Sequence, residues 1–156
     1  MKKIVIALDY DPTAQKIAET GHELALALNA EVVLLHVLLE PIYYSSTAYA
    51  PIMGFGGYVD MDFLQPEIVN ELKKWSLNFL ENTKHYLGDT NIHTCIKTGD
   101  AADCILETAV EEKADIIVMG SLSKKWLEEL LIGSVTQKVL HHSKIPLLII
   151  PTKHKH

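Results

Sequence analysis

Apolar runs of strand length recur along the chain, with stretches that suit helices between them. The β-branched, uninterrupted character of these runs is typical of strands that are covered on both faces of a sheet. The alternation therefore predicts repeated strand–helix–strand units. The predicted strands are Lys3–Leu8, Glu31–Leu38, His93–Gly99, Ala114–Gly120 and Ile145–Pro151.

Helices are predicted where apolar residues recur at helical spacing beside residues that cap or end a helix. The longest carries one apolar stripe, which we interpret as core packing and which consists of Leu72, Trp75, Phe79, Leu80, Tyr86 and Leu87. The predicted helices run from about Pro12 to Asn29, from Pro66–Glu67 onward, from an Asp100 cap to Lys113, and from about Ser134.

Residues 40–66 have no apolar period and are rich in Tyr, Gly, Ser and Pro. The stretch is longer than the usual connection between elements, which predicts a flap or a functional loop. Its tyrosines either stack on a ligand or cover the edge of the core, and the sequence leaves both interpretations open.

The repeated units predict a single α/β domain over residues 1–156, with a doubly wound parallel sheet and helices on both faces. A chain of 156 residues is long enough for one sizeable core. Sheets of this kind bind ligands at the carboxyl ends of their strands, in the crevice where the strand order reverses. The candidate site residues therefore follow the first and fourth strands, at Leu8–Asp9–Tyr10 and Met119–Gly120–Ser121.

The charge of the chain disfavours nucleic acid as the principal partner. The formal net charge is −6, and all 14 basic residues are lysine. Bidentate recognition of guanine and stacking on bases are mainly the work of arginine, which the sequence lacks.

The chain is predicted to be soluble and cytoplasmic, without a membrane partner. Its two cysteines, Cys95 and Cys104, form neither a disulfide scaffold nor a zinc motif, which favours a reduced compartment. The apolar run at the N-terminus covers about six residues and soon meets Asp9 and Asp11, so it does not resemble a signal peptide. No apolar segment approaches the roughly 20 residues that span a bilayer.

No catalytic or metal-binding residue is predicted. The sequence has no GxxxxGK[ST] loop, no GxSxG elbow and no HExxH motif. No acid–base pair stands in a catalytic frame, so we expect slow ATP hydrolysis at most.

The most specific blocks of the sequence are ADIIVMGS and IGSVTQKVLHHSKIPLLII, which accompany KIVIALD, VLLHV and TGDAADCILETA. Through these blocks nearly the whole chain resembles the universal stress protein (UspA-like) family, within the adenine nucleotide α-hydrolase-like superfamily. Nucleotide-binding members of that family carry Gly-x-x-Gly, nine residues, and then Gly followed by Ser or Thr. Here the frame runs from Gly120 to Gly133–Ser134 with matching spacing, and Ser123 replaces the second glycine.

The resemblance implies a strand order of 3-2-1-4-5 and a site for ATP, with or without Mg²⁺, at the point where that order reverses. Asp9 matches the acidic residue that holds the adenosine, and Val37 matches a position that lines the adenine pocket. The nucleotide-binding residues implied in this way are Ala7, Leu8, Asp9, Val37, Met119, Gly120, Leu122, Ser123, Gly133, Ser134, Val135 and Thr136.

The resemblance also implies a homodimer, because family members commonly pair the last strand with its copy. In this chain the pairing strand is Ile145–Pro151, an uncharged apolar segment predicted at the edge of the sheet. Such an edge invites aggregation unless another chain or element covers it.

Elementary chemistry agrees with the nucleotide assignment. A helix that begins at Ser134 presents unpaired N–H groups and the positive end of a dipole, and Gly133 has no Cβ to hold a phosphate away. Asp9 offers acceptor oxygens to ribose hydroxyls or to an exocyclic amine. The same residues also suit plain structural roles, because aspartate caps turns and Gly-Ser caps helices.

Ser123 leaves the strength of the site open. A left-handed backbone at that position costs serine roughly 1–2 kcal/mol, which is about one decade of affinity. Its side chain either blocks the phosphate oxygens or donates its hydroxyl to them. Leu122 stands where binding members often have a polar or basic residue, and Lys124 and Lys125 are either solvated or in contact with phosphate.

Two functions follow as hypotheses. The first is a stress-response regulator or sensor that binds ATP or a related adenine nucleotide. The alternative is a nucleotide-free dimer of the UspA type that acts through protein–protein contacts, with Ser123 and Leu122 as signs of a lost site. A hydrolase or transferase of the same superfold is a third class.

Overall fold

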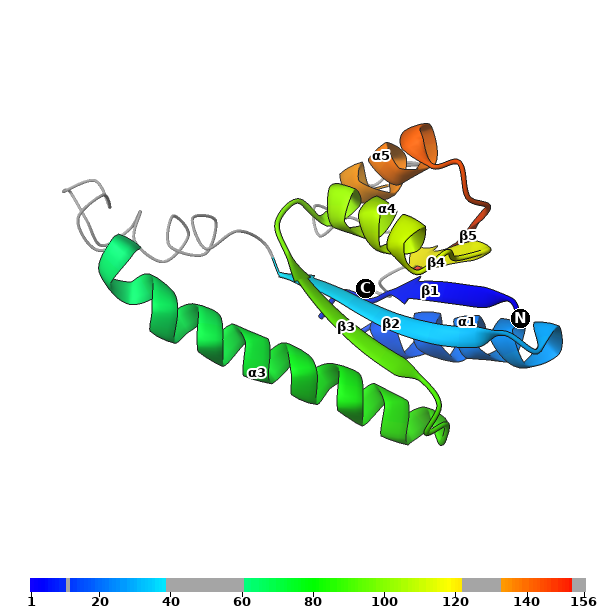
Figure 1. Ribbon diagram of the computed structural model, residues 1–156, viewed down its shortest axis with the longest axis horizontal. Coiled ribbons are helices and arrows are strands. Elements are labelled where there is room, and N and C mark those ends of the chain that lie inside the picture. Colours follow the sequence, from blue (N-terminus) through cyan, green and yellow to red (C-terminus); the bar gives the residue numbers. More distant parts are fainter. Residues whose placement is uncertain (11, 39–60, 122–132, 153–156) are drawn as a thin grey trace.

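A parallel five-stranded sheet forms the centre of the molecule (Figure 1). The computed structural model describes residues 1–10, 12–38, 61–121 and 133–152, and of residues 61–66 it describes the backbone alone. The elements are β1 (Lys3–Ala7), α1 (Ala14–Leu28), β2 (Glu31–Leu38), α3 (Met61–Leu87), β3 (His93–Thr98), α4 (Ala101–Glu111), β4 (Ile116–Gly120), α5 (Ser134–His142) and β5 (Leu147–Ile150).

The strand order is β3-β2-β1-β4-β5, and every neighbouring pair runs parallel, so the predicted doubly wound α/β fold and its order are confirmed. The central strand β1 pairs on both sides, with Ile4 beside Val32 of β2 and beside Ile116 of β4. The order reverses between β1 and β4, which is where a sheet of this kind opens a ligand crevice.

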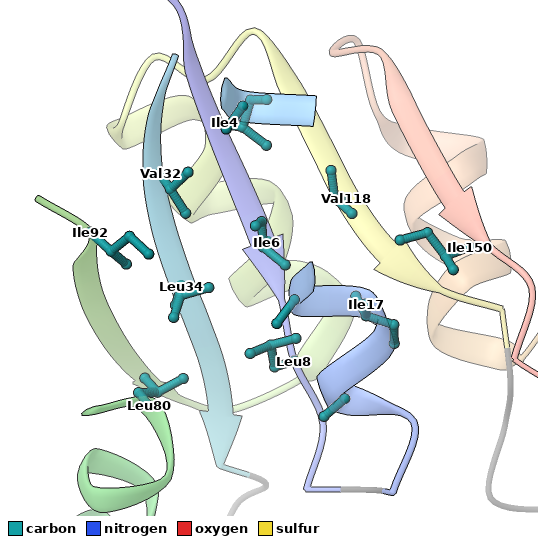
Figure 2. Close-up of a cluster of buried hydrophobic side chains, with 13 residues drawn as sticks. Ile4, Ile6, Leu8, Ile17, Val32, Leu34, Leu80, Ile92, Val118 and Ile150 are labelled. Carbon is teal, nitrogen blue, oxygen red and sulfur yellow. The ribbon is translucent and has the colours of Figure 1, made fainter. Parts of the chain in front are cut away.

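Helices cover both faces of the sheet, with α1 and α3 on one face and α4 and α5 on the other (Figure 1). Alternate residues of β1 serve the two layers, since Ile4 and Ile6 pack with α1 while Val5 packs with α4. All three are fully buried, which explains why β1 is apolar without interruption. Figure 2 shows the layer on the α1 side, where Ile17 and Leu80 from the helices meet Ile6 and Leu34 from the strands.

The long helix differs from its prediction in two ways. It begins at Met61, because Pro66 lies inside the helix and does not mark its first turn. The predicted core stripe is correct for Leu80, which is fully buried, but wrong for Trp75 and Tyr86, which are 67% and 58% exposed. The apolar period extends beyond the part of the helix face that the sheet covers.

Helix ends follow the predicted capping residues closely. Asn29 ends α1 in the left-handed conformation, with φ of 52°. Asp100 caps α4, and its side chain accepts a hydrogen bond from the Asp103 N–H at 2.9 Å. That helix ends at Glu111, two residues before the predicted Lys113, whose φ of 54° lies outside a helix.

Candidate functional site

The carboxyl ends of β1 and β2 bring the predicted adenosine residues to one level. Ala7 lies beside Leu35, and the same register continued by two residues places Asp9 beside Val37. Asp9 is exposed, and its carboxylate has no hydrogen bond or ion pair within the described residues. Val37 and Ala7 are half-buried against the α4 layer. The arrangement leaves carboxylate oxygens open to a ligand beside an apolar wall.

His36 holds the end of β1 in place, although sequence reasoning did not single it out. The residue is 7% exposed, and its Nδ1–H donates to the carbonyl of Leu8 at 2.8 Å. A carbonyl oxygen only accepts, so this bond sets the proton on Nδ1. The imidazole edge also meets the Phe79 ring, with centroids 5.6 Å apart. A histidine inside the apolar run VVLLHVL was the available signal, because a buried polar group needs a partner.

The end of β4 forms the next part of the site. Met119 is buried against the α4 layer and Gly120 is the last residue of the strand. A Cβ on Gly120 would lie 2.6 Å from Ile17 Cδ1 and 3.4 Å from Thr152 Cγ2. Glycine is therefore needed at this position so that α1 can pack closely against β4.

Hydrogen bonds join the two ends of the stretch 122–132 to the sheet. The Gly133 N–H donates to the Ser121 carbonyl at 2.8 Å, and the Ser121 N–H donates to the Ile150 carbonyl at 3.0 Å. The Thr136 hydroxyl donates to the Gly120 carbonyl at 2.9 Å. The predicted site residues Leu122 and Ser123 lie outside the described residues, as do Lys124 and Lys125.

The first turn of α5 is open. Gly133 is the N-cap residue and supplies no side-chain cap, and the first intrahelical bond runs from the Gln137 N–H to the Gly133 carbonyl at 2.9 Å. The N–H groups of Ser134, Val135 and Thr136 precede that bond and point toward the N-terminal end of the helix. Ser134 and Val135 are exposed, whereas Thr136 is 2% exposed with its hydroxyl already engaged. This turn suits an anion through its backbone N–H groups.

A cation on α5 fixes the helix relative to α4. Lys138 Nζ lies 3.0 Å from Asp100 Oδ2 and 3.1 Å from Asp103 Oδ1. The Asp103 N–H and then the Lys138 ammonium hold the pKa of the Asp100 carboxyl below its usual value, and hydrogen bonds to both carboxylates raise the pKa of Lys138. Sequence reasoning missed this cluster, because Lys138 and Asp100 are 38 residues apart and no local pattern links them.

Other chemistry is poorly supported in the described part of the chain. Burial raises the pKa of both Cys95 and Cys104, so each remains a thiol and a weak nucleophile. No three His, Cys, Asp or Glu side chains among the described residues gather closely enough to hold a metal ion. Among those residues, too, no helix is long and apolar enough to cross a membrane.

A doubly wound parallel sheet with an open helix N-terminus at its switch point defines a Rossmann-like α/β protein. The model of the universal stress protein family matches residues 1–151, and the chain belongs to this family.

Two curated relatives cover almost the whole chain. The universal stress protein MJ0577 of Methanocaldococcus jannaschii is 31% identical over 155 residues, which are 97% of this chain and 96% of the relative. The universal stress protein YxiE of Bacillus subtilis is 33% identical over 150 residues, which are 95% of this chain and 97% of the relative.

Solved structures share the fold. The structure of MJ0577 superimposes with a TM-score of 0.74 at 30% identity, covering 99% of this chain and 98% of that one. A universal stress protein in complex with cAMP superimposes with a TM-score of 0.64 at 22% identity, covering 97% of this chain and 98% of that one. At that identity the second likeness shows the fold alone.

Proposed function

We propose that the protein binds ATP or a related adenine nucleotide at the carboxyl edge of its sheet and acts as a stress-response regulator or sensor in the cytoplasm. The observation that carries the proposal is the convergence of an unpaired carboxylate, Asp9, and an uncapped helix N-terminus, Ser134–Thr136, on the switch between β1 and β4. The complex of a relative with cAMP supports the same ligand class.

Each part of the nucleotide has a matching group in this arrangement. Asp9 accepts from ribose hydroxyls or from the adenine amine, and Val37 and Met119 supply apolar surface near the ring. The N–H groups at the start of α5 bind the phosphates, with or without Mg²⁺, and the positive end of the helix dipole adds to the attraction. Ser134 adds an exposed hydroxyl at the same turn.

A charge-matched pair of variants tests this site. Gly133 has φ of −56° and ψ of 154°, a conformation open to any residue, so substitution there does not strain the backbone. Gly133→Asp and Gly133→Asn both place a good N-cap side chain before α5, but only aspartate opposes a phosphate. We expect calorimetry to show that ATP binding is lost in the aspartate variant and at least partly kept in the asparagine variant.

Equal ATP affinity in the two variants would count against phosphate binding at this turn, provided that circular dichroism shows both to be folded. The nucleotide itself is identified separately. Freshly purified protein is denatured, and the supernatant is examined for adenine by absorbance and chromatography.

The alternative function is a nucleotide-free dimer, and the position of β5 at the edge of the sheet favours a pairing surface in either case. Backbone N–H groups of Ile117 and Ser121 donate to the carbonyls of Pro146 and Ile150, so the N–H of Ile149 points to the open edge. We propose a homodimer through Ile145–Pro151. Ile149→Pro removes an outward donor and leaves the bonds to β4 intact, so it should convert the dimer to a folded monomer in analytical ultracentrifugation.

A further inference from the structure

A groove between α1 and α3 has no part in the proposed nucleotide site. It encloses about 600 Å³, within the range of roughly 300–1,000 Å³ that is usual for ligand pockets. None of its lining residues belongs to the implied nucleotide set. It lies on the face of the sheet that α1 and α3 cover, away from α4 and α5 (Figure 1).

One face of α3 forms the longer wall of the groove. Trp75, Asn78, Phe79, Asn82 and Tyr86 line it, at helical positions i, i+3, i+4, i+7 and i+11. Residues with this spacing lie in one stripe along a helix. The stripe therefore alternates aromatic rings with carboxamides, and this wall presents both kinds of group to one ligand.

The aromatic rings of the groove are exposed and yet held in place. Tyr10 and Trp75 are each 67% exposed, and the Tyr10 ring meets Phe79 edge to face with centroids 5.3 Å apart. The Tyr86 hydroxyl donates to Glu19 at 2.5 Å and accepts from the Gln15 amide at 2.8 Å. Exposed rings in fixed positions are typical of binding surfaces, because they lose little conformational freedom when a ligand arrives.

Two carboxamides in the groove have unused hydrogen-bonding capacity. Asn78 and Asn82 lie one helical turn apart and are exposed, and neither side chain has a partner within the described residues. Each offers two donors and one acceptor oxygen. The hydroxyl of Thr83, by contrast, donates to the Phe79 carbonyl. The open groups therefore suit a ligand whose rim carries several hydroxyls.

Charge narrows the class of ligand further. The described lining has no Lys, His, Asp or Glu, and Glu19 beside it is acidic in a chain of net charge −6. Phosphates and carboxylates therefore gain nothing in the groove. An organic cation usually sits in an aromatic cage, whereas the carboxamides alternate with the rings on this wall.

We propose that the groove binds a neutral pyranose sugar. The apolar C–H face of the ring stacks on the aromatic side chains around Trp75, and its hydroxyls bond to Asn78 and Asn82. This chemistry matches both the open rings and the open carboxamides.

The full chain without nucleotide is titrated with methyl β-D-glucopyranoside, maltose and cellobiose, and the side-chain signals of Trp75, Asn78 and Asn82 are followed by nuclear magnetic resonance. At least one sugar should give saturable shifts at these signals. The double variant Asn78→Ala/Asn82→Ala should weaken binding about tenfold or more, because it removes two sets of hydrogen bonds. Asn70→Ala is the matched control, since Asn70 is an exposed asparagine of α3 outside the groove, and it should leave affinity unchanged.

Absence of shifts with every sugar at tens of millimolar, or equal affinity in the double variant, would overturn the proposal. Tetramethylammonium and adenosine are titrated in parallel, and saturable binding of either at the groove in place of a sugar would also overturn it. Sugar binding should persist in Gly133→Asp, so failure at the groove is distinguishable from failure at the nucleotide site.

Discussion

Replacing Gly120 with alanine tests why β4 ends in a glycine. The new Cβ would lie 2.6 Å from Ile17 Cδ1, a distance that real atoms do not keep, and 3.4 Å from Thr152 Cγ2, which is an ordinary contact. The backbone of Gly120 is not in the left-handed region, so alanine is strained only by the contact with Ile17.

The magnitude follows from two opposing effects. Overpacking a buried layer costs about 1–3 kcal/mol, whereas alanine in place of glycine regains about 0.4–1 kcal/mol by restricting the unfolded chain. We therefore expect Gly120→Ala to lower the free energy of unfolding by about 1–2 kcal/mol. Ile17→Val deletes Cδ1 and should cost about 0.5–1.5 kcal/mol alone, because it leaves a small cavity.

The double variant decides between packing and ligand contact. With Cδ1 removed, the nearest remaining atom of Ile17 is 3.5 Å from the new Cβ, so the alanine fills the cavity without overlap. Its stability should return to within about 0.5 kcal/mol of the wild type, a coupling energy of about 2 kcal/mol. Urea unfolding followed by circular dichroism at one fixed protein concentration measures all four proteins.

A coupling energy below about 0.5 kcal/mol would refute the packing explanation of Gly120. ATP affinity adds a second reading from the same four proteins. If the Cβ position faces only Ile17 and Thr152, affinity should recover together with stability. Recovery of stability without recovery of affinity would instead place that Cβ against the ligand.

Further predictions concern the α4 cap and the core. Asp100→Ala should lower the free energy of unfolding by about 1 kcal/mol and Asp100→Asn by less, because asparagine keeps an acceptor for the Asp103 N–H. The pKa of Asp100 is lowered, first by that N–H and then by Lys138, so its stabilisation is present above the ordinary carboxyl pKa and is lost as pH falls through the lowered value. The stability difference between wild type and Asp100→Asn in urea should therefore disappear in acid, and persistence there would contradict the assignment. Leu80→Ala, at a fully buried position, should cost about 2–5 kcal/mol, whereas Leu77→Ala, 47% exposed on the same helix, should cost less than about 0.5 kcal/mol in thermal unfolding.

Strands and their order were predictable because their physical causes are local. Ile4, Val5 and Ile6 form an apolar run that only a doubly covered strand can bury, and the helical stretches between such runs require parallel crossovers. The caps at Asn29 and Asp100 were predictable for the same reason, since each acts within four residues of its own position.

Features that depend on distant partners were not predictable. The apolar period of α3 is the same for Leu80, which the sheet buries, and for Trp75, which faces a groove, and only the position of α1 separates them. Likewise, Lys138 looks like any solvated lysine until α5 lies beside the start of α4. Periodicity gives the direction in which a side chain points, and tertiary structure decides what it meets there.

The glycine frame shows why matched spacing predicts geometry more securely than affinity. Gly120 is explained by the approach of Ile17, and the closure of the loop by the bond from the Gly133 N–H to the Ser121 carbonyl. Both demands are met without a ligand. The ordinary φ of Gly133 means that its lack of a side chain matters for what approaches from outside, not for the backbone. Nucleotide affinity therefore depends on chemistry at the open turn of α5, which the aspartate and asparagine variants of Gly133 measure directly.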